Sequence, residues 1–110
     1  MTQEREISID MTEDEWSAMM NDAEAGRLSA AARAAAASAA PHPGGLGARW
    51  FTCSVAITRE LLKWCEAAAE RCQADDPEGA EILERAARNI VFALWRRGEG
   101  PPPGPIRYRR

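Results

Sequence analysis

Residues 58–98 decide the fold of this chain, and they read TRELLKWCEAAAERCQADDPEGAEILERAARNIVFALWRRG. The first half predicts a helix, because its apolar residues share one helical face: Leu61, Leu62, Cys65, Ala68, Ala69 and Cys72. Asp76 and Pro77 then suit an N-cap and a first helical position. The second predicted helix runs from about Pro77 to Arg97, ends at Gly98, and has this core face: Ile82, Leu83, Ala86, Ile90, Ala93 and Leu94. So short a connection favours antiparallel neighbours.

The N-terminal segment predicts a strand followed by a helix. Apolar and polar residues alternate in EISIDM (6–11), which is typical of a strand with one buried face. Thr12 and Glu15 then have the spacing of a capping box. We therefore expect a helix to begin after Thr12 and to stop at Gly26, where glycine suits a helix end.

The middle of the chain leaves two questions open. The alanine-rich residues 29–40 begin with a possible cap, Ser29, and predict either a closely packed helix or a marginal helix or linker. A Pro/Gly loop follows them. Residues 49–57 alternate like a strand, yet Thr52 or Ser54 is also a possible cap for a helix that continues to Cys72. We favour a helix from about Thr52.

These patterns predict a mainly α fold. It would be a small helical bundle with two long antiparallel C-terminal helices, a short N-terminal β-strand and an extended proline-rich C-terminal tail. Residues 1–98 would form a single helical domain, with the alanine-rich helix and the Pro/Gly loop at 29–47. Residues 99–110 would be an extended basic tail. If residues 106–110 (IRYRR) form a strand, their arginines favour pairing with the acidic strand at 6–10.

Composition narrows the class of protein. The chain has 110 residues, of which 22 are alanine, and this length is enough for one modest core. No apolar run reaches the roughly 20 residues that span a bilayer, and the charged N-terminus does not resemble a signal peptide. Three cysteines fit a reducing compartment, so we expect a cytoplasmic protein. Its use of alanine, arginine and proline is typical of a high-GC bacterial or phage genome.

The charges are unevenly distributed along the chain. Residues 1–25 carry eight acids and one base, whereas residues 85–110 carry seven bases and one acid. This polarity fits a head-to-tail contact between chains or attraction between the two ends, and it fits equally well a set of solvated faces.

Residues with reactive side chains do not form a recognisable site. Cys65 and Cys72 lie about 10.5 Å apart along a helix, too far for a mutual disulfide or an obvious shared ion, so we expect core packing. An intermolecular disulfide or redox role is a lesser alternative. His42 has no evident catalytic partners, and GGLG (44–47) lacks the spacing of a phosphate loop. We predict no catalytic residue, no cofactor and no metal.

The last predicted helix has a second conspicuous face. Arg85, Arg88, Phe92 and Trp95 fall opposite its core residues on a helical wheel. Arginine and tryptophan are enriched at interface hot spots, so we predict that these four residues form a protein interface. The alternative is that another element of the same chain covers this face.

These features favour a non-catalytic interaction module that self-associates as a homodimer: an adaptor, inhibitor or regulatory subunit. A nucleic-acid-binding transcriptional regulator is the alternative, because a strand followed by two helices resembles the order in ribbon-helix-helix repressors. The acidic strand would repel phosphates, so a nucleic-acid partner is not expected. A small-molecule binder or enzyme with a tryptophan-lined groove is a weaker alternative, and no membrane association is expected.

Overall fold

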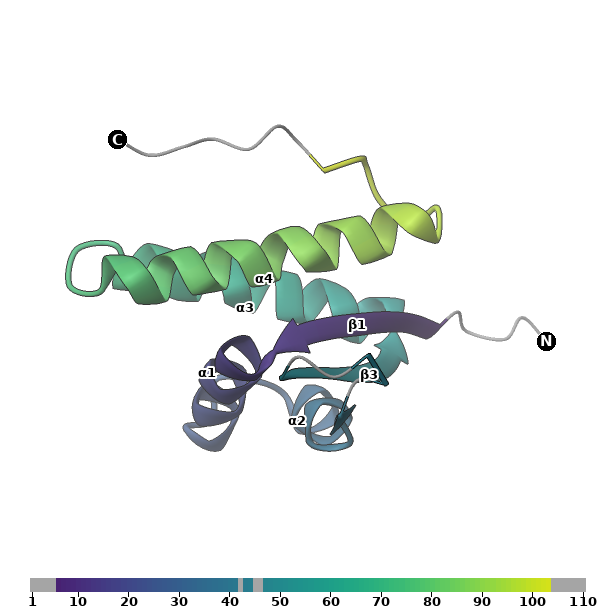
Figure 1. Ribbon diagram of the computed structural model, residues 1–110, viewed down its shortest axis with the longest axis horizontal. Coiled ribbons are helices and arrows are strands. Elements are labelled where there is room, and N and C mark those ends of the chain that lie inside the picture. Colours follow the sequence, from purple (N-terminus) through teal and green to yellow (C-terminus); the bar gives the residue numbers. More distant parts are fainter. Residues whose placement is uncertain (1–5, 42, 45–46, 104–110) are drawn as a thin grey trace.

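A computed structural model describes residues 6–41, 43–44 and 47–103 (Figure 1). Its elements are, in chain order, β1 (Glu6–Thr12), α1 (Glu13–Glu24), α2 (Ala30–Ala37), β2 (Ala40–Pro41), β3 (Ala48–Ser54), α3 (Val55–Cys72) and α4 (Pro77–Arg96). Helices hold most of these residues, which confirms the prediction of a mainly α chain.

Local hydrogen bonds explain where the helices begin. Thr12 Oγ1 accepts from the Glu15 amide at 3.2 Å. Glu15 Oε1 accepts in turn from the Thr12 amide at 2.9 Å, so the predicted capping box is present. Asp76 Oδ1 accepts from the Gly79 amide at 3.0 Å and begins α4. Gly98 follows α4 with a φ of 72°, a conformation that glycine adopts without strain.

The prediction of a helix from Thr52 is wrong, because residues 48–54 form the strand β3. This strand pairs along its whole length with β1 in antiparallel register, so that Ile7 faces Cys53 and Ile9 faces Phe51. The strand β1 provides hydrogen-bond partners for backbone N–H and C=O groups of residues 48–54. Short apolar runs in the sequence do not show whether such a partner strand is present. The Ser54 hydroxyl accepts from the Ile57 amide at 3.2 Å. This bond caps the start of α3.

The sheet has one buried face and one exposed face. Its strand order is β1-β3-β2, and all pairs are antiparallel. The side chains that alternate onto its core face are Ile7, Ile9, Met11, Phe51 and Cys53, whereas Glu6, Ser8, Asp10, Trp50 and Thr52 are exposed. The proposed strand at residues 106–110 lies outside the described residues, and β1 has β3 as its described partner.

All four helices contribute to a single core with that sheet face. The fully buried side chains include Met19 of α1, Ala32 and Ala36 of α2, Leu61 and Cys65 of α3, and Ala86 and Ile90 of α4. Residues 30–37 are therefore an ordered helix, in which alanine lets the backbone approach its neighbours closely. Trp16 Nε1 donates to the Ala36 carbonyl at 2.9 Å and fixes α1 on α2.

The helices α3 and α4 lie side by side as the longest elements of the molecule, joined by the turn at residues 73–76 (Figure 1). The strand β1 runs beside α4, which lies above it in this view, whereas α1 and α2 lie toward the bottom. The side of α4 away from β1 has no other helix or strand of the described chain against it, and the described residues that follow α4 turn back above its C-terminal end (Figure 1). Within the described ranges, no helix is both long and apolar enough to cross a membrane.

Candidate functional site

The candidate site is the side of α4 that points away from the core. We call it the α4 outer face and define it by six exposed residues: Glu81, Arg85, Arg88, Phe92, Trp95 and Arg96. It contains all four residues that the sequence predicted as an interface. Opposite them, Leu83, Ala86, Ile90 and Leu94 are buried, whereas Ile82 and Ala93 of the predicted core face are half-buried.

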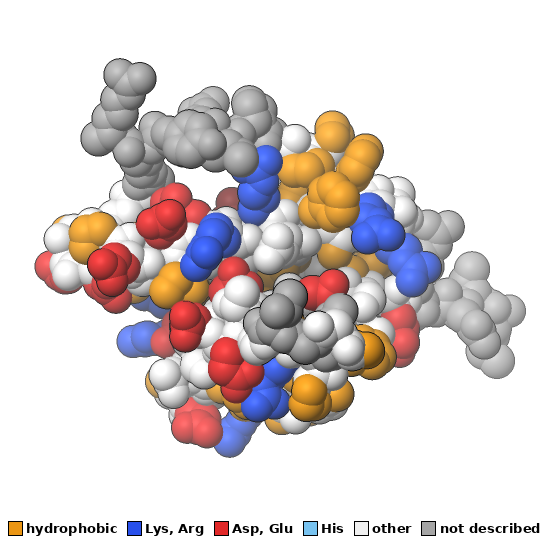
Figure 2. All heavy atoms as spheres, viewed as in Figure 1, with side chains coloured by type: hydrophobic (Ala, Val, Ile, Leu, Met, Phe, Trp, Pro, Cys, Tyr) orange, Lys and Arg blue, Asp and Glu red, His pale blue; other side chains and the backbone are white. Residues whose placement is uncertain are grey.

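Two aromatic side chains stand out on this face. Phe92 is 43% exposed and Trp95 is 44% exposed, and they are two of the three large apolar side chains with such exposure among the described residues. Figure 2 shows hydrophobic side chains gathered toward the top of the view, above the C-terminal half of α4, with basic side chains beside them. Both rings therefore lie at the surface of the described part of the chain.

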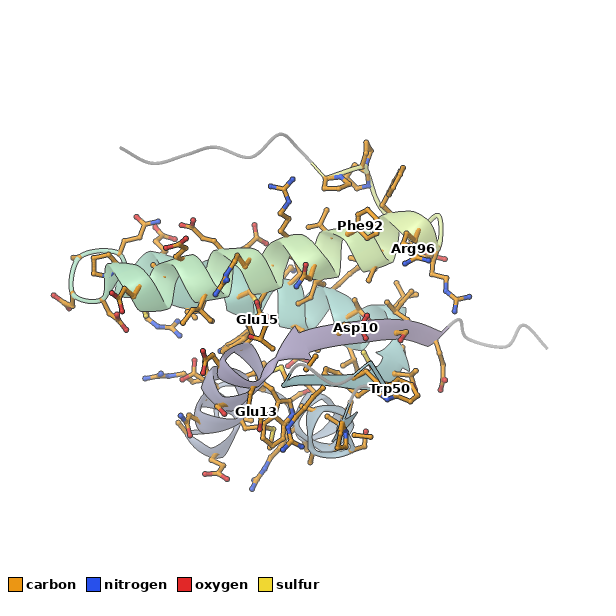
Figure 3. All side chains as sticks on the ribbon, in the orientation of Figure 1. Asp10, Glu13, Glu15, Trp50, Phe92 and Arg96 are labelled. Carbon is orange, nitrogen blue, oxygen red and sulfur yellow. The ribbon has the colours of Figure 1, made fainter. Side chains whose placement is uncertain are left out.

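The aromatic rings and an arginine form a stacked group. The ring centroids of Phe92 and Trp95 lie 5.6 Å apart with an interplanar angle of 57°. The Arg96 guanidinium lies 5.7 Å from the centre of the Phe92 ring, and Figure 3 shows the two side chains together near the C-terminal end of α4. This separation is within range of a cation–π interaction. The predicted interface did not include Arg96, although a position four residues after Phe92 on a helix indicates this contact.

The charges along the α4 outer face change sign from one end to the other. Glu81 lies at its N-terminal end, one turn after Glu78 of the same helix, whereas Arg85, Arg88 and Arg96 follow. Within the described part of the chain, Glu81, Arg85 and Arg88 have no ion pair or hydrogen bond through their side chains. Arginines that are exposed and uncompensated in this way are available to a partner.

The other tryptophans have different environments. Trp64 is buried, and its Nε1 donates to Asp22 Oδ2 at 2.6 Å. Trp16 is half-buried beneath the Arg49 guanidinium, which lies 4.2 Å from its ring centre. Trp50 is 37% exposed on the outer face of the sheet, where it lies opposite Asp10 (Figure 3). Two of the four tryptophans therefore hold the fold together, and two lie at the surface on different elements.

The cysteines are packed into the fold as free thiols. Cys53 and Cys65 are buried and Cys72 is half-buried. Burial raises the pKa of Cys65 to about 12, and the nearby charges of Glu15 and Glu66 act in the same direction. Burial also raises the pKa of Cys53, against a smaller lowering by its hydrogen bond with Thr58 at 3.1 Å. These thiols are held in the unreactive protonated form.

The remaining candidates for chemistry do not assemble into a site. Among the residues that the structure describes, no group of three or more His, Cys, Asp and Glu side chains is arranged to hold a metal ion. His42 lies outside the described residues. The carboxylates of Glu13 and Glu15 serve the fold: Glu15 belongs to the capping box, and Glu13 accepts a hydrogen bond from Arg49 Nε at 2.7 Å. The Arg49 hydrogen bond lowers the pKa of Glu13.

We compared the chain with protein-family models, with curated proteins and with solved structures, and found no match in any of the three.

Proposed function

We propose that this protein is a non-catalytic interaction module that binds another protein chain through the α4 outer face. It would act as an adaptor, an inhibitor or a regulatory subunit. The observation that carries this proposal is the exposure of Phe92 and Trp95, stacked on one another and flanked by arginines. Aromatic residues and arginine are enriched at protein interfaces and dominate their binding energy.

The packing behind this face supports a binding role. The turn at residues 73–76 and the side-by-side placement of α3 and α4 support an antiparallel helix pair at the centre of a small bundle. Leu83, Ala86 and Ile90 anchor the inner side of α4 in the core. A helix fixed in this way presents its outer side chains on a rigid backbone, which reduces the entropy lost on binding.

The three free cysteines support a reducing compartment, such as the cytoplasm, as the place of action. Buried thiols with a raised pKa fit a protein that keeps its cysteines reduced. The exposed strand face is less suited to nucleic acid, because Glu6 and Asp10 lie on it and would repel phosphate groups.

The test is capture of partners from an extract of the native host on immobilised full-length protein, followed by mass spectrometry. We expect the wild-type chain to retain a specific protein and the double variant Phe92→Ala/Trp95→Ala to lose it. A matched double variant on the exposed side of α3, Lys63→Ala/Glu70→Ala, should retain the same protein. Circular dichroism of all three chains establishes that they are folded.

Two results would contradict the proposal. One is that the wild-type chain retains no more protein than an uncoupled support. The other is that the Phe92→Ala/Trp95→Ala variant, with an unchanged helical spectrum, retains the same partner as the wild type.

A further inference from the structure

The α4 outer face has the spacing of a coiled-coil seam. Glu81, Arg85, Arg88, Phe92 and Trp95 follow one another at alternating intervals of four and three residues. Residues with this spacing form a nearly straight line along a helix and meet a second helix that lies alongside. The line holds two exposed aromatic rings and two arginines with no described polar partner, so it is suited to another helix of complementary composition.

The charges on α4 indicate what that second helix is. The first turns of α4 are acidic, with Glu78 and Glu81, and the last turn is basic, with Arg96. Two parallel copies of α4 would place like charges side by side at both ends. In two antiparallel copies the acidic end of each α4 instead points toward the basic end of the other, and the helix dipoles are opposed. The outer face is therefore complementary to itself in the antiparallel sense.

One antiparallel register also matches the positions along the seam. Positions 85 and 95 have their midpoint at position 90, and so do positions 88 and 92. An antiparallel pair of helices that cross at position 90 therefore places Arg85 opposite Trp95 of the second copy and Arg88 opposite Phe92 of that copy. The twofold symmetry repeats each pair. This register produces four contacts between an arginine and an aromatic ring, a pairing that is favourable when the cation lies over the ring face.

We propose that the partner of the α4 outer face is a second copy of this chain, bound through an antiparallel α4–α4 contact in which Arg85 and Arg88 stack on Trp95 and Phe92 of the other copy. This proposal rests on the proposed function and specifies its partner. The two copies form a symmetric dimer, because each contributes the same surface.

The exposed aromatic area sets the expected strength of the dimer. A fully buried aromatic side chain buries about 200 Å². Phe92 and Trp95 are each a little less than half exposed, so four rings in two copies supply roughly 350 Å², to which the arginine stems add. Stable interfaces bury about 1,200–2,000 Å² in total. The aromatic rings supply less than about a third of the lower figure, so we expect a weak and reversible association with a dissociation constant of tens of micromolar or more.

The test is sedimentation equilibrium of the full-length chain at concentrations from about 1 μM to about 1 mM, the range in which such affinities are measured. We expect a monomer–dimer equilibrium for the wild type. Trp95→Arg places an arginine opposite Arg85 of the second copy, and we expect it to raise the dissociation constant about tenfold or more. The control Glu70→Arg, an exposed change on α3, should leave the dissociation constant unchanged.

A reciprocal exchange then tests the register. In the double variant Arg85→Trp/Trp95→Arg, each tryptophan again faces an arginine of the other copy, so we expect dimerisation to return to within a few-fold of the wild type. The two changes lie ten residues, or about 15 Å, apart on one helix, so they cannot compensate each other within a single copy. Recovery therefore reports a contact between copies.

Three results would overturn the proposal of a second copy. The first is a monomer throughout the concentration series. The second is a dimer whose dissociation constant does not change with Trp95→Arg, and the third is a folded Arg85→Trp/Trp95→Arg variant that remains as weakened as Trp95→Arg alone. If the wild type is monomeric but captures a different protein through Phe92 and Trp95, the second copy is excluded and the proposed interaction function stands. If it neither dimerises nor captures a protein, both fail.

Discussion

The hydrogen bond between Asp22 and Trp64 provides the sharpest test of the tertiary structure. Asp22 lies near the end of α1, and its Oδ2 accepts from the indole Nε1 of buried Trp64 in α3 at 2.6 Å. The same carboxylate forms ion pairs with Arg27 at 2.9 Å and Arg71 at 3.3 Å. We predict that Asp22→Ala destabilises the protein mainly through the loss of the Trp64 contact.

The size of this effect follows from the exposure of each partner. A hydrogen bond to a charged group contributes about 1.5–3 kcal/mol, and its loss leaves the indole N–H of Trp64 without an acceptor in the interior. The Arg27 and Arg71 side chains are 55% and 49% exposed. Solvent screening therefore limits each ion pair to about 0.2–1 kcal/mol. We expect Asp22→Ala to lower the free energy of unfolding by about 2–4 kcal/mol.

The measurement is urea unfolding followed by far-ultraviolet circular dichroism, which does not depend on the fluorescence of Trp64. A double-mutant cycle with Trp64→Phe isolates the hydrogen bond, because phenylalanine has no donor to leave unsatisfied. We expect a coupling free energy of about 1.5 kcal/mol or more. Asp22→Asn keeps an acceptor oxygen and should cost less than Asp22→Ala. Arg27→Ala should cost about 1 kcal/mol at most.

A coupling below about 0.5 kcal/mol, with an unchanged urea dependence, would refute this reasoning. It would mean that Trp64 does not donate to Asp22, and that α1 is not fixed on α3 in the way the structure shows.

Two further predictions concern pH and thiol reactivity. The Arg49 hydrogen bond lowers the pKa of Glu13 from its ordinary value of 4.5. The ionised Glu13 therefore stabilises the folded state above pH 4.5, and this stabilisation is lost as the pH falls through the lowered pKa. In thermal unfolding, the deficit of Glu13→Gln relative to the wild type should therefore shrink between about pH 6 and about pH 3, and a constant deficit would contradict the ion pair. An alkylating reagent should modify half-buried Cys72 first and reach buried Cys53 and Cys65 only as the protein opens. Mass spectrometry of a labelling time course checks this, with Cys72→Ser as the control that removes the fast reaction; equally fast labelling of Cys65 would show that the core is open.

The composition of the α4 outer face was evident from the sequence, but its exposure was not. The helical period places Phe92 and Trp95 opposite the core side of α4, because that follows from 3.6 residues per turn alone. Whether α1 or α2 covers those rings depends on where the chain places those helices. The structure packs α1 and α2 around the sheet and leaves the rings exposed.

The sequence by itself determined the local structure of this protein. The capping box at Thr12, the Asp76 cap with Pro77, and Gly98 each act within a few residues of their own position. The helix boundaries that they set could therefore be predicted. These interactions need no information about the rest of the chain.

Only the tertiary structure decided how distant segments pair. The strand β3 forms because β1 lies beside it, although more than thirty residues separate the two in the sequence, and the apolar alternation at 49–57 is equally compatible with either structure. The Asp22–Trp64 hydrogen bond joins residues 42 positions apart for the same kind of reason. The packing of the whole core determines which backbone and side-chain groups form hydrogen bonds across such distances. A local sequence pattern therefore does not predict the hydrogen-bond partner of each group.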